Sequence, residues 1–472
     1  SSSHFCSRTP RARGPRPALA AGSAMAELPA AAEALVREVA RTAVRAWLAA
    51  PGSDVEKALR RAMRSRHAEL DQAARAQVAD RTLGVAVLRG RLEHLLEREV
   101  RPGAGADASL LLELFSLRER PRGGRAAAPA PEPGAKATEE ASEAAALVVA
   151  ATAALFRAEE RPSPAARLAV AWSLPLWLAS RWVRELGAPT AFALGRAMVA
   201  PARVTLRANT LRITRLRLLE AISAVGVRAV PTAQSPWGLW LPDGRPPGGG
   251  VWQLPGWKEG WFEVQDEGSQ LVALATEAQP GERAVDYCAG RGGKTWALAA
   301  LVAPRGAVRA WDVDAELRQQ LRGARAARAG AEGLVEAPEE RPAPGADGTG
   351  TADVVLVDAP CSSSGALRRH PSQRWALGEG EVDLLPRLQL QVLREAALLV
   401  RPGGRLVYAT CSLLRAENGD VADAFEAACG KDFEPWPFEG RAVNGHCRTL
   451  LPHVDGTDGF FIARWRRRAG GT

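Results

Sequence analysis

Apolar residues recur at helical spacing through the first third of the chain. Leu35, Val39 and Val44 lie four to five positions apart in a stretch rich in Ala, Leu and Arg, and such spacing puts apolar side chains on one face of a helix. The predicted helical segments cover residues 28–101, 110–117 and 139–158. We therefore predict an all-α domain over residues 28–165, interrupted by a Pro/Gly/Ala-rich loop at residues 121–138.

The hydrophobic pattern changes to alternating strands and helices after residue 262. Four apolar runs of strand length are separated by segments with helical spacing; they cover residues 284–287, 307–311, 354–357 and 406–409. Strands that alternate with helices form a parallel sheet covered by helices. We therefore predict an α/β domain over residues 263–468. A segment of mixed helix and strand, at residues 166–262, connects it to the N-terminal helices.

Length and composition are those of a globular protein with several domains. The chain has 472 residues, enough for two or three domains, and its hydrophobic share of 46% lies in the globular range. No apolar run reaches the roughly 20 residues that a membrane span requires, so we expect no membrane association. The six cysteines form no CxxC pair, and no His cluster stands at zinc-binding spacing. We therefore expect no metal site and no disulfide framework.

Positive charge is concentrated in one part of the chain. The formal net charge is +9, and between Arg157 and Glu220 there are eleven arginines and four acidic residues, with Trp172, Trp177 and Trp182 among them. One interpretation is a solvated helix face beside a tryptophan-rich core. The other is a surface that contacts phosphates, because fixed arginines displace the counterions of a nucleic acid. The sequence leaves both interpretations open.

The N-terminal 27 residues differ in composition from the rest of the chain. They contain four arginines, several serines and many alanines, with no acidic residue before Glu27. This composition is typical of an organellar transit peptide, which would place the protein in a chloroplast or a mitochondrion. The alternative is upstream sequence outside the protein, with Met25 as its first residue and a cytoplasmic location.

A glycine-rich turn follows the first predicted strand of the α/β domain. It runs from Asp286 to Thr295 (DYCAGRGGKT), and glycines at a strand-to-helix turn let the backbone approach a nucleotide-like ligand. It is not a phosphate-binding P-loop, because that motif requires glycine where Cys288 stands. Asp312, at the end of the next strand, is placed to accept hydrogen bonds from ribose hydroxyls. Turn and acid indicate an adenosine-type cofactor, and a dehydrogenase would share both.

Two cysteines stand at the carboxyl ends of predicted strands. Asp358-Ala-Pro-Cys361 follows one strand, and Thr410-Cys411-Ser follows the next. Ligands of open parallel sheets bind at this edge. A single buried cysteine usually acts as a small hydrophobic residue, but two cysteines at the edge that carries the cofactor turn predict a reactive site.

These three motifs together resemble the RNA cytosine-C5 methyltransferase family, the Sun/NOL1/NOP2 group. The resemblance covers about residues 200–465 and is strongest to the bacterial-type 16S rRNA enzymes with a NusB-like N-terminal domain. The first 165 residues match that domain only in being helical and in their place in the chain. The other matching segments are Arg207-Ala-Asn209-Thr-Leu, Leu254-Pro-Gly, Val264-Gln-Asp-Glu-Gly-Ser-Gln270, Arg368-Arg369-His-Pro with Trp375, and Asp458-Gly-Phe-Phe461.

The resemblance implies a Rossmann-like domain that uses S-adenosylmethionine to methylate C5 of cytosine in RNA, with small-subunit rRNA as the expected substrate. It assigns the nucleophile that attacks C6 of cytosine to Cys411 and product release to Cys361. It places Asp358 at N3 of the base, and Lys294 near Asp358 and Cys411, where a cation favours the thiolate. The cofactor-binding residues that it implies are Cys288, Ala289, Gly290, Arg291, Gly292, Gly293, Lys294, Asp312 and Asp358. It implies an RNA-binding subdomain at residues 166–262, and the residues expected at the RNA are Arg207, Asn209, Arg368 and Arg369.

Two departures from the family pattern leave alternatives open. The acid of the third cofactor motif is absent, since Leu334-Val-Glu-Ala-Pro338 stands there, and Gly290-Arg291 replaces the usual Ala/Ser-Pro. The altered third motif and the degenerate N-terminal domain make a non-catalytic ribosome-assembly factor with the same fold the main alternative, although the cysteines, Asp358 and Lys294 are intact. A dehydrogenase is the weaker alternative, because it accounts for neither cysteine motif. We expect a monomeric enzyme.

Overall fold

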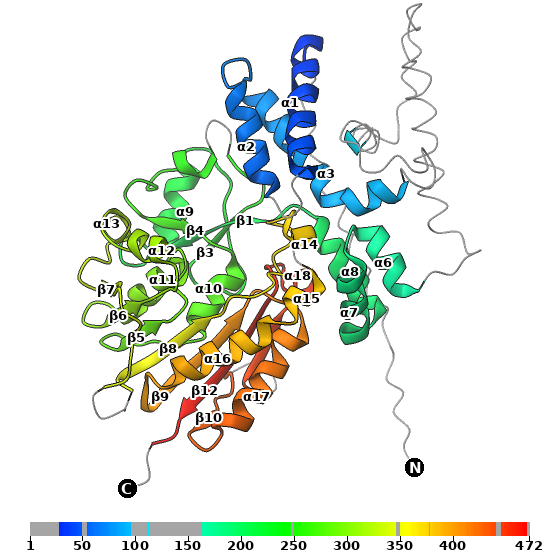
Figure 1. Ribbon diagram of the computed structural model, residues 1–472. Coiled ribbons are helices and arrows are strands. Elements are labelled where there is room, and N and C mark those ends of the chain that lie inside the picture. The colour runs from blue at the N-terminus through cyan, green and yellow to red at the C-terminus, as the bar shows by residue number, and fades with distance from the viewer. Residues whose placement is uncertain are drawn as a thin grey trace, which may run out of the picture.

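The computed structural model describes residues 28–49, 54–95, 111–112, 163–246, 250–345, 350–376, 378–439 and 445–469. The predicted transit peptide, the loop at 121–138 and the helix at 139–158 lie outside these residues. Figure 1 shows the N-terminal helices beside two sheets, with the smaller sheet between the helices and the larger sheet in this view.

Among the described residues, three helices with buried apolar side chains form most of the N-terminal part, as the spacing predicted. They are α1 (Ala30–Leu48), α2 (Val55–Ser65) and α3 (Gln72–Leu95). The carboxylate of Asp54 caps α2 by accepting the backbone N–H of Glu56 at 2.8 Å. Val36, Val44 and Val78 are fully buried between the helices, so burial of the apolar faces holds this part together. That it resembles NusB stays a prediction.

Helices continue beyond residue 165, where the sequence indicated a mixture of helix and strand. They are α6 (Pro164–Trp172), α7 (Leu176–Leu186) and α8 (Ala188–Val199). Their apolar faces pack on one another and on Leu367 and Leu414 from the C-terminal half. Trp182 is fully buried, and Arg181 donates to Asp383 at 2.6 Å. The tryptophan-rich stretch is therefore largely a core.

A four-stranded antiparallel sheet follows, with the order β2-β3-β1-β4. Its strands are β1 (Val204–Ala208), β2 (Val230–Pro231), β3 (Gly238–Leu241) and β4 (Phe262–Val264), and α9 (Arg215–Ala224) lies between β1 and β2 in the chain. Leu206, Leu239 and Phe262 are buried with Leu218 and Ile222 of α9. One face of this sheet is therefore covered by α9.

The larger sheet contains the four strands that the sequence predicted. Among the described residues it has eight strands, in the order β10-β12-β9-β8-β5-β6-β7 with β11 paired to β12. Neighbours from β7 to β9 are parallel, whereas β10, β11 and β9 are antiparallel to β12. The bounds are β5 Arg283–Asp286, β6 Ala307–Ala310, β7 Val335–Glu336, β8 Ala352–Asp358, β9 Val400–Thr410, β10 Phe433–Pro435, β11 Cys447–Leu450 and β12 Phe460–Arg467.

Helices cover both faces of this sheet, as expected for a Rossmann-like domain. Side chains of α10 and α11 share one buried cluster with the sheet, and side chains of α16 and α17 share the other. None of the described helices is both long and apolar enough to cross a membrane. The helices of this half are α10 Glu267–Leu274, α11 Gly293–Val302, α12 Ala315–Gln320, α13 Ala324–Ala329, α14 Gln373–Ala376, α15 Glu379–Val382, α16 Leu385–Ala397, α17 Gly419–Cys429 and α18 Pro452–Asp455.

Strand order fixes where a ligand can bind. The chain runs outward from β5 through β6 to β7, and then returns to place β8 on the other side of β5. In such sheets ligands bind outside the carboxyl ends of the strands where the order reverses. Asp286 and Asp358 end β5 and β8 at this point, and Thr410 ends the adjacent β9.

Arg374 ties the N-terminal helices to the segment that follows Cys361. Its side chain is only 2% exposed, and burial lowers the pKa of its guanidinium to about 10. The guanidinium donates to the carbonyls of Val87, Ser173 and Met198. A single arginine thereby joins α3, the end of α6 and α8 to the α/β part.

Candidate active site

The two cysteines that ended predicted strands lie side by side. Because β8 and β9 are parallel neighbours, with Asp358 opposite Ala409, the segments that follow them leave the sheet together. Cys361 Sγ lies 3.3 Å from Cys411 Sγ. The sequence placed both residues at one sheet edge, and the structure brings the sulfur atoms into contact.

Buried hydrogen bonds hold the two cysteine segments in register. The carboxylate of Glu417 is fully buried and accepts the backbone N–H of Ser362 at 2.8 Å and the hydroxyl of Ser412 at 2.5 Å. The amide of Gln389 donates to the same carboxylate at 3.0 Å. One side chain thus links the residue after Cys361 to the residue after Cys411. The sequence showed Glu417 near the second motif but gave it no role.

A close backbone approach also fixes the position of Cys411. The backbone N–H of Gly365 donates to the carbonyl of Cys411 at 2.8 Å. A Cβ at Gly365 would lie 2.4 Å from the carbonyl oxygen of Gly459, so only glycine fits between the two segments. The Cys411 thiol in turn donates to the hydroxyl of Ser363 at 3.4 Å.

The pKa values of the two thiols are shifted in opposite directions. The hydrogen bond from Cys361 lowers the pKa of Cys411 and outweighs burial, and Lys294 contributes in the same direction. That same hydrogen bond, together with burial, raises the pKa of Cys361 well above its ordinary value. The pair therefore shares one proton, with the thiolate favoured at Cys411. Since the thiolate is the nucleophilic form, Cys411 is the more reactive cysteine.

Lys294 connects the glycine turn to the end of β8. It is the second residue of α11, and its Nζ lies 2.5 Å from Oδ2 of Asp358. Burial alone would lower the pKa of Lys294, but the Asp358 carboxylate outweighs it and the pKa is raised. Lys294 is therefore a cation beside the thiol pair, in the position that the family resemblance implied.

The glycine turn has the shape that an adenosine-type cofactor requires. The backbone N–H of Gly290 donates to Asp312 at 2.8 Å, and the second Asp312 oxygen accepts a backbone N–H within its own loop. Gly292 has φ +82°, and a Cβ there would lie 2.5 Å from Leu321. A Cβ at Gly290 would meet nothing within 4 Å, so space remains above the turn. These residues fit the cofactor that the sequence indicated.

The other residues of the turn have different environments. Ala289 and Gly292 are buried, whereas Arg291 and Gly293 are exposed. The exposed side chain of Arg291 does not close the turn, so this departure from the family pattern leaves the turn intact. Burial raises the pKa of the Cys288 thiol well above its ordinary value, which makes that cysteine unreactive.

Asp286 is a buried acid at the base of the turn to which the sequence gave no role. It is fully buried, and burial raises its pKa to about 7. One carboxylate oxygen accepts the hydroxyl of Thr295 at 2.7 Å. Because the other oxygen has no partner among the described residues, Asp286 supports the turn more easily as a neutral acid.

The prediction that Arg207 and Asn209 contact RNA is wrong for these side chains. Arg207 is 1% exposed and donates to Gln265 at 2.6 Å. Asn209 is 3% exposed, and its amide donates to the carbonyls of Gly260 and Ala329. Both side chains join the smaller sheet to its neighbours, so phosphates cannot reach them.

Arg368 also faces inward, and Arg369 is partly exposed. Arg368 donates to Asp458 at 2.6 Å, in an ion pair whose side chains are 6% and 3% exposed. Arg369 pairs with the same carboxylate and donates to Asp266 at 2.7 Å. The prediction that Arg368 holds an RNA phosphate is therefore corrected, because its side chain is enclosed with a buried carboxylate. The Arg369 side chain is 26% exposed, so its contact with RNA stays a prediction.

Arg368→Met should lower stability rather than act on RNA binding alone. The substitution leaves Asp458 as a buried carboxylate that has lost one of its two arginines, which costs about 3 kcal/mol in free energy of unfolding. Urea unfolding of both proteins measures the loss. The matched control is Arg415→Met, because the Arg415 side chain is 68% exposed in its pair with Asp420 and such exposed pairs contribute little to stability. Equal losses in the two variants would contradict this assignment.

Known proteins are similar to this chain in sequence and in fold. The family model described as 16S rRNA methyltransferase RsmB/F matches residues 273–466, and a ferredoxin-like domain model of RsmF/B-like methyltransferases matches residues 174–246. The chain is 34% identical to "Probable ribosomal RNA small subunit methyltransferase B" of Bacillus subtilis (strain 168), over 65% of this chain and 69% of that protein. It is 38% identical to ribosomal RNA small subunit methyltransferase B of Xylella fastidiosa (strain 9a5c), over 66% and 72%.

Solved structures agree in fold. The crystal structure of PH0851 aligns with a TM-score of 0.71 at 24% identity, covering 93% of this chain and 99% of that chain. NSun6 from Pyrococcus horikoshii, solved with SFG, aligns with a TM-score of 0.52 at 18% identity, covering 61% and 97%. Motifs, fold and relatives agree: the chain belongs to the RsmB/F family of 16S rRNA methyltransferases, the Sun/NOL1/NOP2 group that its motifs indicated, with S-adenosylmethionine as its cofactor.

Proposed function

We propose that this protein methylates C5 of a cytosine in small-subunit rRNA through a transient covalent bond between Cys411 and C6 of the base. The observation that carries the proposal is the 3.3 Å contact between Cys361 and Cys411, at the sheet edge that also carries the cofactor turn. Two thiols whose pKa values are shifted in opposite directions suit a reaction that first forms and then breaks a bond to sulfur.

The chemistry accounts for both thiols. Cytosine C5 is a weak nucleophile, and addition of the Cys411 thiolate to C6 makes C5 electron-rich. S-adenosylmethionine, when bound at the glycine turn, supplies an electrophilic methyl group. Loss of the C5 proton and cleavage of the bond between sulfur and C6 then restore the ring and the free thiolate. Cys361, in contact with Cys411, is the group that assists this release.

Asp358 and Lys294 lie where they can stabilise the addition. Charge moves toward N3 of the base as sulfur adds to C6, and a group fixed in advance near that charge stabilises the transition state. Once N3 takes up a proton as the charge develops, its N–H would donate to the Asp358 carboxylate, which the ion pair with Lys294 holds in place. The same lysine favours the thiolate of Cys411.

Lys294→Gln should shift the pH dependence of methyl transfer upward by about one unit. Without the cation the pKa of Cys411 rises, so less thiolate exists at neutral pH and activity returns partly at higher pH. Rates of methyl transfer measured across pH give the shift. Lys258→Gln is the control, because Lys258 is an exposed lysine outside the site. A rate that falls equally at every pH would show that Lys294 acts in another way.

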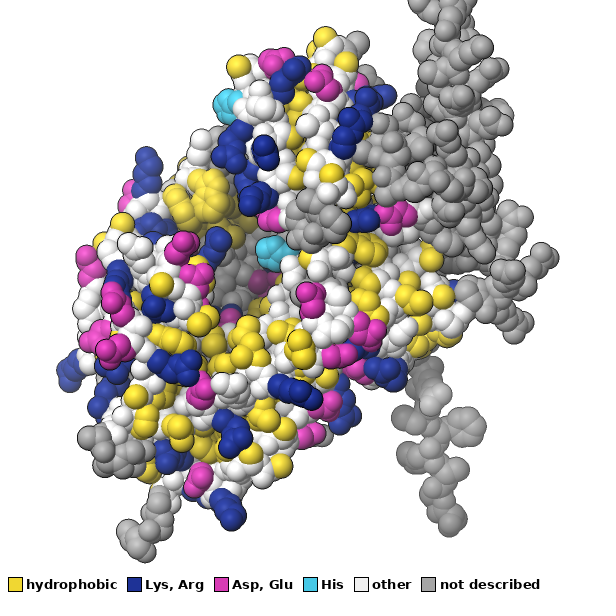
Figure 2. Space-filling view, in the orientation of Figure 1, with side chains coloured by type: hydrophobic (Ala, Val, Ile, Leu, Met, Phe, Trp, Pro, Cys, Tyr) yellow, Lys and Arg dark blue, Asp and Glu magenta, His cyan; other side chains and the backbone are white. Residues whose placement is uncertain are grey.

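Exposed basic side chains elsewhere offer an RNA surface, since the side chains of Arg207, Asn209 and Arg368 are buried. Lys57, Arg61 and Arg64 of α2 are exposed, and Figure 2 shows Lys and Arg side chains gathered on the N-terminal helices beside a hollow in this face. Such charges attract the phosphate backbone without reading its sequence. The target cytosine must be unpaired or flipped out to reach Cys411.

The proposal is tested by identifying the methylated nucleoside. Purified protein, S-adenosylmethionine and small-subunit rRNA should yield 5-methylcytidine, detected by mass spectrometry after digestion of the RNA to nucleosides. Bisulfite sequencing of RNA from cells that lack the protein then identifies the cytosine. Methylation of another atom, or of no rRNA, would reject the proposal, and failure to bind S-adenosylmethionine would favour a non-catalytic assembly role.

A further inference from the structure

A cavity lies between the smaller sheet and the segment that leads into β12. Its volume is about 210 Å³, below the roughly 300–1,000 Å³ typical of sites for drug-sized ligands. Arg203, Thr205, Trp240, Asp266, Glu267 and Gly456 are among the residues that line it. A space of this size suits one planar ring.

One wall of the cavity is a stacking surface. The guanidinium of Arg203 lies 4.6 Å from the ring centre of Trp240. Gly456, at φ +75°, makes room for it, since a Cβ there would lie 2.7 Å from an Arg203 nitrogen. Unstacked RNA bases bind on guanidinium planes and aromatic rings in this way.

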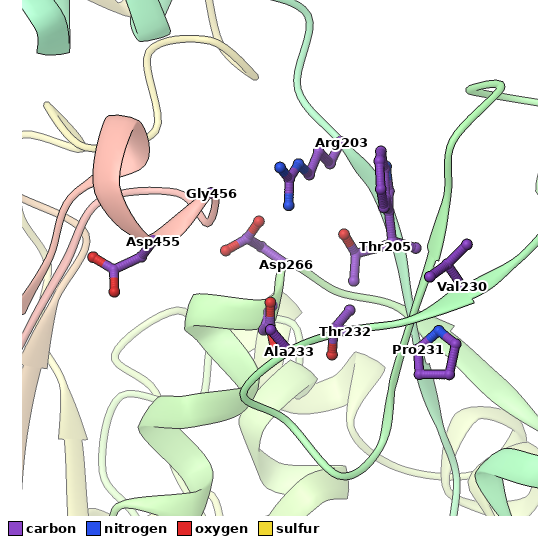
Figure 3. A pocket seen from close by; sticks show the side chains of 11 residues that line it. Arg203, Thr205, Val230, Pro231, Thr232, Ala233, Asp266, Asp455 and Gly456 are labelled. Carbon is purple, nitrogen blue, oxygen red and sulfur yellow. The ribbon is translucent and has the colours of Figure 1, made fainter. Parts of the chain in front are cut away.

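The opposite wall carries hydrogen-bond acceptors. Glu267 is 6% exposed, and one carboxylate oxygen accepts the backbone N–H groups of Gln234 and Ser235. Within the described parts of the chain, the other oxygen of Glu267 and the guanidinium of Arg203 form no recorded hydrogen bond. Figure 3 shows Arg203 and Asp266 directed toward each other across the cavity. The guanidinium of Arg203 and one oxygen of Glu267 can therefore hydrogen-bond to a polar ligand in the cavity.

The segments that line the cavity continue into the active site. Gly456 lines it, and three residues later Gly459 donates its backbone N–H to Gly365 at 2.9 Å, the residue that holds the carbonyl of Cys411. On the other side, Gln265 follows β4 and precedes Asp266, and its amide lies close to Gly293 of the cofactor turn. A nucleotide in the cavity would therefore contact segments that also position Cys411 and the cofactor turn.

The geometry points to a subsite for one unpaired nucleobase that neighbours the target cytosine and carries an exocyclic amino group. This inference rests on the proposed function, since it presupposes RNA at Cys411. An amino group can donate to the free carboxylate oxygen of Glu267 while the ring stacks on Arg203. Uracil has no amino group and would present a carbonyl oxygen to the Glu267 carboxylate, so the subsite should disfavour uracil.

Selection from an RNA pool tests the subsite without requiring methyl transfer. The probe is a pool of short single-stranded RNAs with one fixed cytosine and random neighbours, bound to protein without S-adenosylmethionine and then sequenced. Wild-type protein should enrich cytosine, adenine or guanine over uracil by about tenfold at one fixed distance from the cytosine. Arg203→Met should lose this preference. Arg203→Lys, which keeps the charge but not the plane, should retain affinity and lose the preference.

Arg196→Met is the matched control, because Arg196 is an exposed arginine of α8 that does not line the cavity. It should lower affinity for all RNAs equally and keep the base preference. The absence of any preference in the wild type, or an unchanged preference in Arg203→Met, would overturn the inference. Neither result depends on methylation, so the proposed function fails or stands on its own assay.

Discussion

Cys411→Ala should lower methyl transfer to RNA by at least about 10⁴-fold, because without the thiolate no bond forms at C6 and C5 stays unreactive. The structure supports this expectation through the lowered pKa of Cys411 and its place beside Lys294. Transfer of a labelled methyl group to small-subunit rRNA, under single-turnover conditions, measures the loss. Binding of S-adenosylmethionine should be unchanged.

Cys429→Ala provides the matched control. Cys429 is a partly buried free cysteine at the end of α17 and lies outside the site, so its removal should leave the rate within a few-fold of wild type. Retention of substantial activity by Cys411→Ala would remove the nucleophile from the proposal.

Cys361→Ala should trap the protein on its RNA. The thiol of Cys361 touches the sulfur that leaves C6, and its raised pKa keeps it protonated, as a group that assists release must be. Without it the bond between Cys411 and C6 persists. A slowly migrating band of protein with RNA should appear on a denaturing gel and should disappear after RNase treatment.

The double variant Cys361→Ala/Cys411→Ala separates the two roles. It should form no adduct, since it differs from Cys361→Ala only in the loss of the nucleophile. Because Cys361 is partly buried, thermal melting of each variant checks that the fold persists. If Cys411→Ala trapped RNA and Cys361→Ala did not, the roles of the two cysteines would be exchanged.

Part of the site could be predicted from the sequence, and the rest was identified only in the structure. Alternation of strand and helix predicted the parallel sheet, and side chains that end adjacent parallel strands must lie at one edge. That argument placed Cys361 and Cys411 at the edge that carries the cofactor turn, and the family resemblance implied that Asp358 and Lys294 lie beside them. Glu417 was visible in the sequence, but its role was not, because its partners come from three separate segments.

The local pattern of the chain thus determined the sheet, the turn and the two cysteines, since each depends on residues close in sequence. The tertiary structure alone decided the direction in which the arginines face. Arg207, Arg368 and Arg369 resemble RNA-binding residues in the sequence, yet Arg368 pairs with Asp458, ninety residues away. Arginine is stable either at a phosphate or against a buried carboxylate, and the choice depends on which acid the fold brings within reach.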